Sequence, residues 1–110
     1  MPTHEEEPRF WDDYDRLTKR QQELFQVAVV KFVTDLRLGR FRPGLRVAAV
    51  QAHPGVYEMT WAPDGRATFS FGRTARPGER HVIWRRIGTH DISLGPDERA
   101  EKRMADGQRS

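Results

Sequence analysis

The spacing of the apolar residues changes abruptly near residue 42, and this change limits the possible folds more than any other feature. From Lys19 to Leu38 apolar side chains recur every three or four residues, as on one face of an α-helix. They are Leu24, Phe25, Ala28, Val29, Phe32, Val33 and Leu36. After residues 42–44, Arg-Pro-Gly, the spacing becomes two, which is typical of β-strands. The chain therefore has one long helix followed by strands.

Both ends of the helix have the residues that helix ends require. Thr18 and Gln21 have the spacing of a capping box, in which each side chain accepts a backbone N–H bond from the other residue. Gly39 suits the left-handed position that commonly follows a helix. We therefore expect a helix over Lys19–Leu38. The aromatic and acidic run Phe10–Leu17 predicts a short ordered segment that lies against the domain.

Four strands are expected after the helix, each separated from the next by glycine, proline or acidic residues. They are Leu45–Ala52, Gly55–Trp61, Arg66–Gly72 and Arg80–Gly88. Consecutive strands joined by short turns form an antiparallel sheet. The predicted fold class is α+β, with an N-terminal helix or helical pair packed on a four-stranded antiparallel sheet.

The Asp-Gly pair at residues 64–65 predicts a hairpin between the two middle strands. We expect Ala62 to pair with Arg66, which places Glu58 opposite Ser70 and collects the apolar side chains on one face. The last strand alternates imperfectly around residues 83–87. Apolar and charged side chains thus share each face of this strand, which favours a strand near the middle of the sheet, or one with a bulge.

Length and charge indicate one domain with two charged ends. A chain of 110 residues is long enough for one core. We expect a disordered acidic lead-in over residues 1–8, a single domain over 9–93 and a flexible charged tail over 94–110. The formal net charge is +3; the lead-in contributes −3 and the tail zero, so residues 9–93 carry +6. This excess favours a polyanionic partner.

The composition excludes several classes of protein. The chain has no cysteine, so disulfides and thiolate metal sites are impossible. It has no apolar run long enough to span a membrane and no secretory signal, so a cytoplasmic location is expected. The histidines His4, His53 and His81 lack the spacing of metal ligands. We expect no metal and no other cofactor.

Polar residues on the predicted sheet suggest one kind of chemistry. Glu58 and Arg66 fall on the polar face of the hairpin, and His90 follows the last strand. RNA cleavage by its own 2′-hydroxyl needs a base, an acid and cations around the phosphate, and these residue types could supply them. The remaining candidates for phosphate binding are Arg46, Arg85 and Arg86. The residues alone leave alternatives open: Glu58 could be a solvated or paired carboxylate, and His90 a turn residue.

The hairpin GVYEMTW…DGRATFSFG and the closing run IGTHD resemble the RelE/ParE superfamily of bacterial toxin–antitoxin toxins, over about residues 10–92. The resemblance implies N-terminal helices on an antiparallel sheet and a cytoplasmic toxin restrained by a cognate antitoxin. It implies a phosphate contact for Arg66 and a role on the leaving group for His90. Some relatives have lysines where Glu58 and Thr60 stand here. The carboxylate therefore either substitutes as base or the cleavage function is lost.

Three functions follow from this resemblance. The favoured one is a metal-independent endoribonuclease that cuts mRNA in the ribosomal A site and so inhibits translation. The first alternative is a ParE-like toxin that binds and inhibits DNA gyrase. The second is a non-catalytic member of the superfamily that acts as a binding module. Whether the chain is an enzyme is thus left open, with an endoribonuclease preferred.

Overall fold

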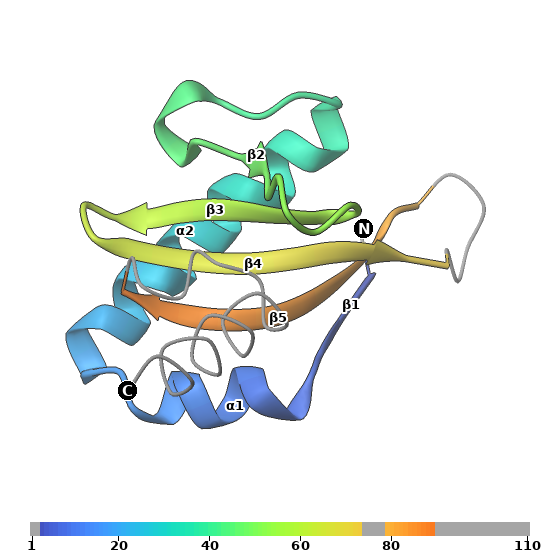
Figure 1. Cartoon of the computed structure of the whole chain (residues 1–110). Coiled ribbons are helices and arrows are strands. Elements are labelled where there is room, and N and C mark those ends of the chain that lie inside the picture. The colour runs from blue at the N-terminus through green and yellow to red at the C-terminus, as the bar shows by residue number, and fades with distance from the viewer. Residues whose placement is uncertain (1–2, 74–78, 90–110) are drawn as a thin grey trace.

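The computed structural model of the chain describes residues 3–73 and 79–89 (Figure 1). Two helices and one 3₁₀ turn are combined with five strands. The helical elements are α1 (Pro8–Asp15), α2 (Lys19–Leu38) and η1 (Pro43–Leu45). The strands are β1 (Thr3–Glu6), β2 (Ala48–Ala49), β3 (Val56–Ala62), β4 (Gly65–Gly72) and β5 (His81–Thr89). The expected α+β class is confirmed.

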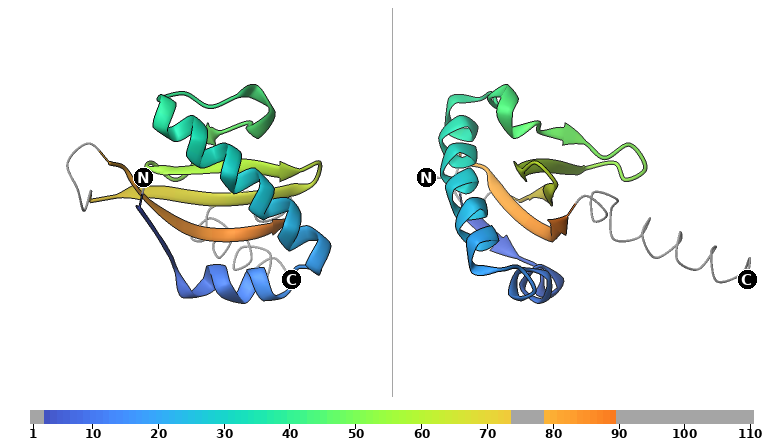
Figure 2. Two further views of the ribbon diagram at one scale, coloured as in Figure 1. Left: turned by 180° about the vertical axis from the view of Figure 1, so that it is seen from behind. Right: turned by 90° about the vertical axis from the view of Figure 1, so that its left-hand side faces the viewer.

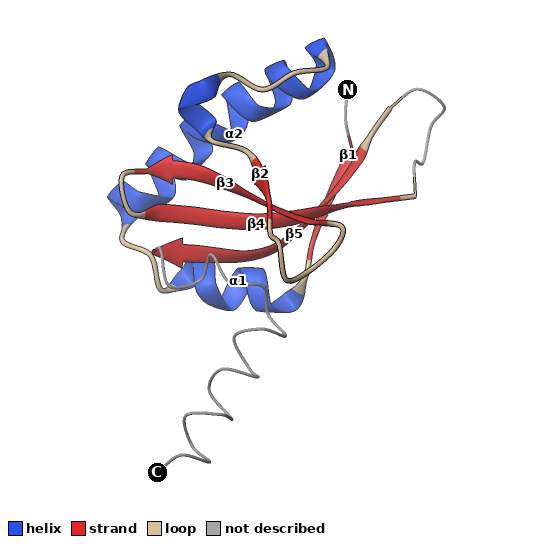
Figure 3. Ribbon diagram, turned by 45° about the horizontal axis from the view of Figure 1, so that its top comes forward, coloured by secondary structure: helices blue, strands red, loops and turns tan. Residues whose placement is uncertain are grey.

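The strands form one mixed sheet in the order β1-β5-β4-β3-β2. Helix α2 crosses one face of this sheet diagonally, and α1 lies along the β5 side (Figure 2). Strands β2 to β5 pair antiparallel, as expected, whereas β1 pairs parallel with β5. Figure 3 shows β1 entering the sheet beside β5 and leading directly into α1.

Helix α2 has the bounds that the sequence predicted. Thr18 and Gln21 form the complete capping box, and Gly39 ends the helix with a left-handed φ of 84°. Its apolar stripe packs on the sheet and places Phe32 at the centre of the core. The Phe32 ring centroid lies 4.9 Å from that of Phe69 and 5.1 Å from that of Trp84. The helical spacing of the apolar residues thus places Phe32 against Phe69 and Trp84, the main contact between α2 and the sheet.

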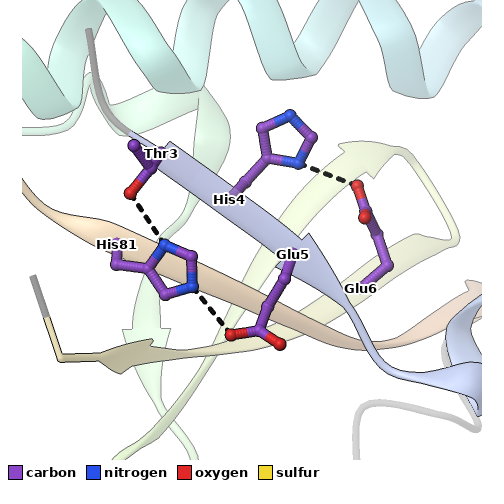
Figure 4. Close-up of polar contacts among 5 residues, drawn as sticks. All are labelled: Thr3, His4, Glu5, Glu6 and His81. Atoms are coloured by element: carbon purple, nitrogen blue, oxygen red, sulfur yellow. Dashed lines mark hydrogen bonds and ion pairs between the residues drawn. The ribbon is translucent and has the colours of Figure 1, made fainter. Parts of the chain in front are cut away.

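The N-terminus differs from the expected disordered lead-in. The described residues of 1–8 are ordered, because the backbone of β1 pairs with β5 from Thr3 to Glu6. His81 reinforces this pairing: its Nδ1 lies 2.7 Å from the Thr3 hydroxyl and its Nε2 lies 2.8 Å from a Glu5 carboxylate oxygen (Figure 4). The prediction was wrong because it relied on local charge, whereas β1 is stabilised by a strand far away in the sequence.

The hairpin register is shifted by two residues from the expected one. Ala62 pairs with Gly65 and not with Arg66, so Glu58 lies opposite Thr68 and not Ser70. A bulge at Trp61 absorbs the extra residue that the shorter turn leaves on β3. A shift of two keeps every side chain on its predicted face, because the strand period is two.

The irregular last strand is explained by a bulge, one of the two expected causes. Thr68 pairs with Arg86 and Phe69 with Trp84, so Arg85 is the extra residue on β5. The bulge allows both Trp84 and Ile87 to reach the core. The prediction of a first strand over residues 45–52 was wrong in its length. Only the two residues of β2 pair within that range.

Candidate functional site

The face of the sheet away from α2 has a row of polar side chains across its strands. Glu58 of β3 pairs with Thr68 of β4, which pairs in turn with Arg86 of β5. Arg66 lies two residues from Thr68 along β4 and is therefore the diagonal neighbour of Glu58. Side chains of this face alternate with the core residues Met59 and Ala67, so the hairpin itself positions the row.

Glu58 has the electrostatic environment of a carboxylate base. Burial raises the pKa of its half-buried carboxyl above the ordinary 4.5, and the positive charge of Arg66 opposes part of this rise. A raised pKa makes a carboxylate a stronger proton acceptor at neutral pH. The role of Glu58 as a base, expected from its residue type, stays a prediction.

Arg66 is fixed at the hairpin turn. Its Nη1 donates to the carbonyl oxygens of Ala62, Pro63 and Gly65, at 3.4, 3.3 and 2.9 Å. These bonds go to neutral acceptors, and Arg66 forms no ion pair with the acidic residues that the structure describes. Its charge is therefore held in place without being neutralised, as an anion-binding group requires.

A cationic groove of about 540 Å³ borders this face along the edge of β3. Strand β2 covers β3 only at Tyr57 and Glu58, and the groove lies where β2 does not reach. Its charged lining residues are Lys31, Arg42, Arg46 and Arg66. No aspartate or glutamate lines it within the described part of the chain. The groove thus offers several cations to one ligand.

Arg46 reaches the groove from a strained backbone. It follows η1 with φ 46° and ψ 46°, and it is the one non-glycine residue with positive φ in the described ranges. That conformation costs on the order of 1–3 kcal/mol for a residue with a side chain. Arg46 was predicted to contact phosphate. Its side chain is exposed and lines the groove.

Arg42 is tied to α2 by a bidentate ion pair. Its Nε and Nη2 each donate to Asp35 at 2.8 Å, and its backbone N–H adds a bond of 2.9 Å. These hydrogen bonds hold the pKa of Asp35 at about 2, below the ordinary 3.8. The sequence reading missed both Arg42 and Lys31 as groove residues. Lys31 could have been found from its position one helical turn after Val27, away from the core-facing stripe.

The two adjacent arginines of β5 are engaged in ion pairs. Arg86 donates from Nε and Nη2 to the buried Asp13 at 2.6 and 3.0 Å. Arg85 Nη1 lies 3.3 Å from a Glu7 carboxylate oxygen. We expected both arginines to contact phosphate, but these pairs occupy guanidinium groups that such contacts would use. These ion pairs attach β5 to the N-terminal segment that contains Glu7 and Asp13.

His90 lies outside the described residues, as does the expected tail over 94–110. The last described residue is Thr89, which pairs with Gly65 at the end of the sheet that has the hairpin turn. The chain therefore leaves β5 beside the turn where Arg66 is anchored. Glu58, Arg66 and Arg46 are brought to one region of the molecule, whereas Arg85 and Arg86 of β5 are engaged by Glu7 and Asp13.

Neither described helix combines the length and apolar character needed to cross a membrane. In the same residues, no three histidine, aspartate or glutamate side chains come together in a group that could hold a metal ion.

Solved structures of bacterial toxins have the same arrangement of helices and strands. The toxin–antitoxin complex DinJ-YafQ of E. coli matches with a TM-score of 0.61, 15% identity, and coverage of 86% of this chain and 98% of that chain. YafQ from E. coli strain BL21(DE3) matches at 0.57 and 16%, over 86% and 100%. The chain has the RelE-like toxin fold. The expected resemblance is therefore confirmed at the level of the fold.

A copper-bound mutant toxin from Helicobacter pylori shares this fold, with a TM-score of 0.60, 15% identity, and coverage of 83% of this chain and 97% of that chain. No protein-family model matches the sequence, and no curated protein matches it significantly. At such low identity the likeness concerns the fold alone.

Proposed function

We propose that this protein is the toxin of a toxin–antitoxin system and acts as a metal-independent, ribosome-dependent mRNA endonuclease that inhibits translation. The observation that best supports the proposal is that Glu58, whose pKa is raised, is the diagonal neighbour of Arg66, which is anchored at the turn and lines the cationic groove. Both lie on a scaffold shared with bacterial toxins. The site of action would be the cytoplasm, where translated mRNA is found.

The chemistry is an in-line transesterification of RNA. Glu58 removes the proton from a 2′-hydroxyl, whose oxygen attacks the adjacent phosphorus. The bond from phosphorus to the 5′-oxygen breaks, and His90 donates a proton to that oxygen. The products are a 2′,3′-cyclic phosphate and a free 5′-hydroxyl. The step needs no metal, because acid, base and cations come from the chain itself.

Arginine and lysine side chains would hold the RNA backbone. Arg66, next to Glu58, is the contact to the phosphate that reacts. Arg46 and Lys31 lie further along the groove and would bind flanking phosphates. We leave Arg85 and Arg86 out of this set because acidic side chains engage both.

The proposal includes a cognate antitoxin as partner. The DinJ-YafQ structures are complexes of a toxin with its antitoxin, and this chain shares the toxin's fold. A groove lined by cations and by no described acidic residue would accept an acidic segment of such a partner. Binding there would exclude RNA from the same cations.

A second candidate is a toxin that binds DNA gyrase and cuts no RNA. The ion pairs of Arg85 and Arg86 favour it, because they leave fewer arginines for RNA than the sequence suggested. In that case the cationic groove would be a docking surface, and Glu58 and His90 would have no chemical role.

One experiment separates the two candidates. The wild type and His90→Ala are induced in cells and added to translating extracts, and the 5′ ends of mRNA are mapped. New ends in the wild type that are lost in His90→Ala support cleavage with His90 as acid. Equal cutting by both variants would remove His90 from the mechanism. Absence of new ends together with loss of gyrase supercoiling would select the second candidate, and normal growth with soluble protein would contradict both.

A further inference from the structure

A second pocket lies on the helix side of the sheet, away from Glu58 and Arg66. It has a volume of about 290 Å³ and is bounded by α2 on one side and by β1 and α1 on the other. Six of its lining residues are aromatic: Phe10, Trp11, Tyr14, Phe25, Phe32 and Trp84. Such a pocket suits a bulky apolar group, because rings offer a large rigid contact area.

The walls of this aromatic pocket are fixed before any ligand binds. The Tyr14 hydroxyl accepts a bond of 2.9 Å from Gln26 of α2, and the Tyr14 carbonyl accepts one of 3.0 Å from Gln22. These bonds attach α1 to α2 at the rim. On the opposite wall, β1 is held to β5 by its backbone pairing and by His81. A pre-formed pocket avoids the entropic cost of ordering its walls on binding.

The mouth of the aromatic pocket is acidic. Glu6 is the one carboxylate among the lining residues, which include no lysine and no arginine. Its Oε1 lies 2.8 Å from Nδ1 of the exposed His4 (Figure 4). Of the other carboxylates in residues 5–15, Glu7 and Asp13 are paired with arginines of β5, whereas Asp12 and Asp15 on α1 are exposed. With Glu6 at the mouth and no lysine or arginine in the lining, the pocket favours a cationic group over a phosphate, in contrast to the cationic groove.

Trp11 adds a further site for a cation at the rim. Its side chain is exposed, with a fractional exposure of 48%. Edge-to-face contacts with Phe10 and Tyr14, at centroid distances of 5.6 and 5.7 Å, hold its ring. A lysine or arginine over an indole face is attracted by the ring quadrupole. The rim thus combines an immobilised indole with nearby carboxylates.

We propose that the aromatic pocket binds one aromatic or large aliphatic side chain from a positively charged segment of a partner protein. The apolar side chain enters between α1 and α2, and flanking lysines or arginines contact Glu6 and Trp11. This partner has the opposite charge to one that would fill the cationic groove. The proposal is independent of RNA cleavage, because it concerns the other side of the sheet and is tested by binding alone.

The test measures binding of labelled helical peptides by fluorescence anisotropy. The first peptide is alanine-based, with a central tryptophan flanked by lysines. The second has alanine in place of the tryptophan, and the third has glutamates in place of the lysines. We expect the first to bind, and each of the others to bind roughly tenfold more weakly or worse. Equal binding of the lysine and glutamate peptides, or binding of neither, would overturn the proposal.

Matched variants locate the binding site. Val33 lines the pocket, whereas Val30, three residues earlier on α2, is 67% exposed and does not line it. Val33→Trp should fill the pocket and abolish binding, and Val30→Trp should leave binding unchanged. Circular dichroism and thermal unfolding check that both variants fold. Undiminished binding to folded Val33→Trp would contradict the proposed location.

A charge swap provides the test if Val33→Trp does not fold. Glu6→Lys reverses the charge at the mouth without adding volume to the aromatic wall. It should weaken binding of the lysine peptide and strengthen binding of the glutamate peptide. An unchanged preference for the lysine peptide would show that the charge at the mouth does not select the partner.

Discussion

Arg46 keeps a backbone conformation that glycine would adopt at lower cost. The strain is stored at a residue whose side chain lines the cationic groove. The Arg46 backbone therefore lowers stability, whereas its side chain favours ligand binding.

Arg46→Gly should raise the free energy of unfolding by up to about 1 kcal/mol, because glycine relieves the strain; its added freedom in the unfolded chain limits the gain. The same change should weaken RNA binding, because one phosphate contact is lost. Urea denaturation and salt-dependent RNA binding measure the two effects. Arg46→Lys keeps the charge and the strain, so it should change both properties less. Parallel loss of stability and binding in Arg46→Gly would contradict this assignment.

Glu58 makes the cleavage and the stability depend on pH in opposite ways. Its folded pKa is raised above 4.5, so the folded protein binds the proton more tightly than the unfolded chain. Stability should therefore fall as pH rises from about 4.5 through the folded pKa, while the basic form needed for cleavage accumulates.

Glu58→Gln should remove both dependences. The variant should be at least as stable as the wild type at neutral pH, because burial no longer disfavours a charge, and it should lose cleavage. Thermal unfolding across pH 4–8 and cleavage rates over the same range, roughly spanning the carboxylate titration, provide the measurements. Asp64→Asn, at the exposed hairpin turn, is the matched control. Retained cleavage in Glu58→Gln would exclude Glu58 as the base.

At the scale of elements, Asp35 connects α2 to the segment that forms one side of the cationic groove. Its pKa of about 2 lies below the ordinary 3.8 because Arg42 donates several hydrogen bonds to it. The stabilisation is complete above pH 3.8 and is lost as pH falls through about 2. Asp35→Asn should flatten the fall in melting temperature over this interval. Circular dichroism melts at stepped pH test this, and an unchanged acid profile would contradict it.

Asp13 connects α1 to the part of β5 that β1 does not cover. Its carboxylate accepts from Arg86 and, at 3.3 Å, from the backbone N–H of Ile87. A side chain thus substitutes for a missing neighbouring strand. Because the pair is buried, the loss of one partner is expensive even where the pair itself adds little net stability.

Asp13→Ala should therefore lower the free energy of unfolding by about 3–5 kcal/mol. The double variant Asp13→Leu, Arg86→Met should lose less, because neither charge then remains buried without the other. Urea denaturation measures both, with the exposed Asp12→Ala as control, for which a change within about 0.5 kcal/mol is expected. A small change in the free energy of unfolding for Asp13→Ala would show that other contacts attach α1 to β5.

Local patterns predicted the elements that depend on local forces. The bounds of α2 follow from a cap, a periodic stripe and a glycine, all of which lie within or beside the helix. Strand β1 and the role of Asp13 were not predictable in this way, because both depend on β5, more than seventy residues later. The hairpin faces were predicted correctly, whereas the turn was shorter than the sequence suggested. Distance along the chain thus explains why β1 and the role of Asp13 were missed, whereas the error in the hairpin turn was a local one.

The candidate site shows the same division. Glu58, Arg66 and Arg46 were proposed from residue type and strand parity, and they lie in one region. Lys31 and Arg42 were missed because their place in the groove depends on how α2 and η1 pack beside β3. Arg85 and Arg86 were assigned to phosphate because a sequence shows charges and not their partners.

At the scale of the whole molecule, the charges are separated into two regions. The cationic groove lies on one side of α2, and the acidic N-terminal segment with its aromatic pocket lies on the other. This polarity gives an RNA and a basic partner segment different places to bind. It also explains why a net charge of only +3 is compatible with a surface for polyanions.

We propose that Arg66 and its neighbours cleave mRNA on the ribosome without a metal. The most direct measurement is cleavage of an mRNA in purified translation complexes, with Arg66→Ala compared with the equally charged change Arg37→Ala on the exposed end of α2. Magnesium must be kept for the ribosome, so the fragments are tested for the 2′,3′-cyclic phosphate and 5′-hydroxyl ends that this mechanism produces. We expect such ends, and a rate lowered about a hundredfold or more by Arg66→Ala alone. Fragments with 5′-phosphate ends, or equal rates for the two variants, would contradict it.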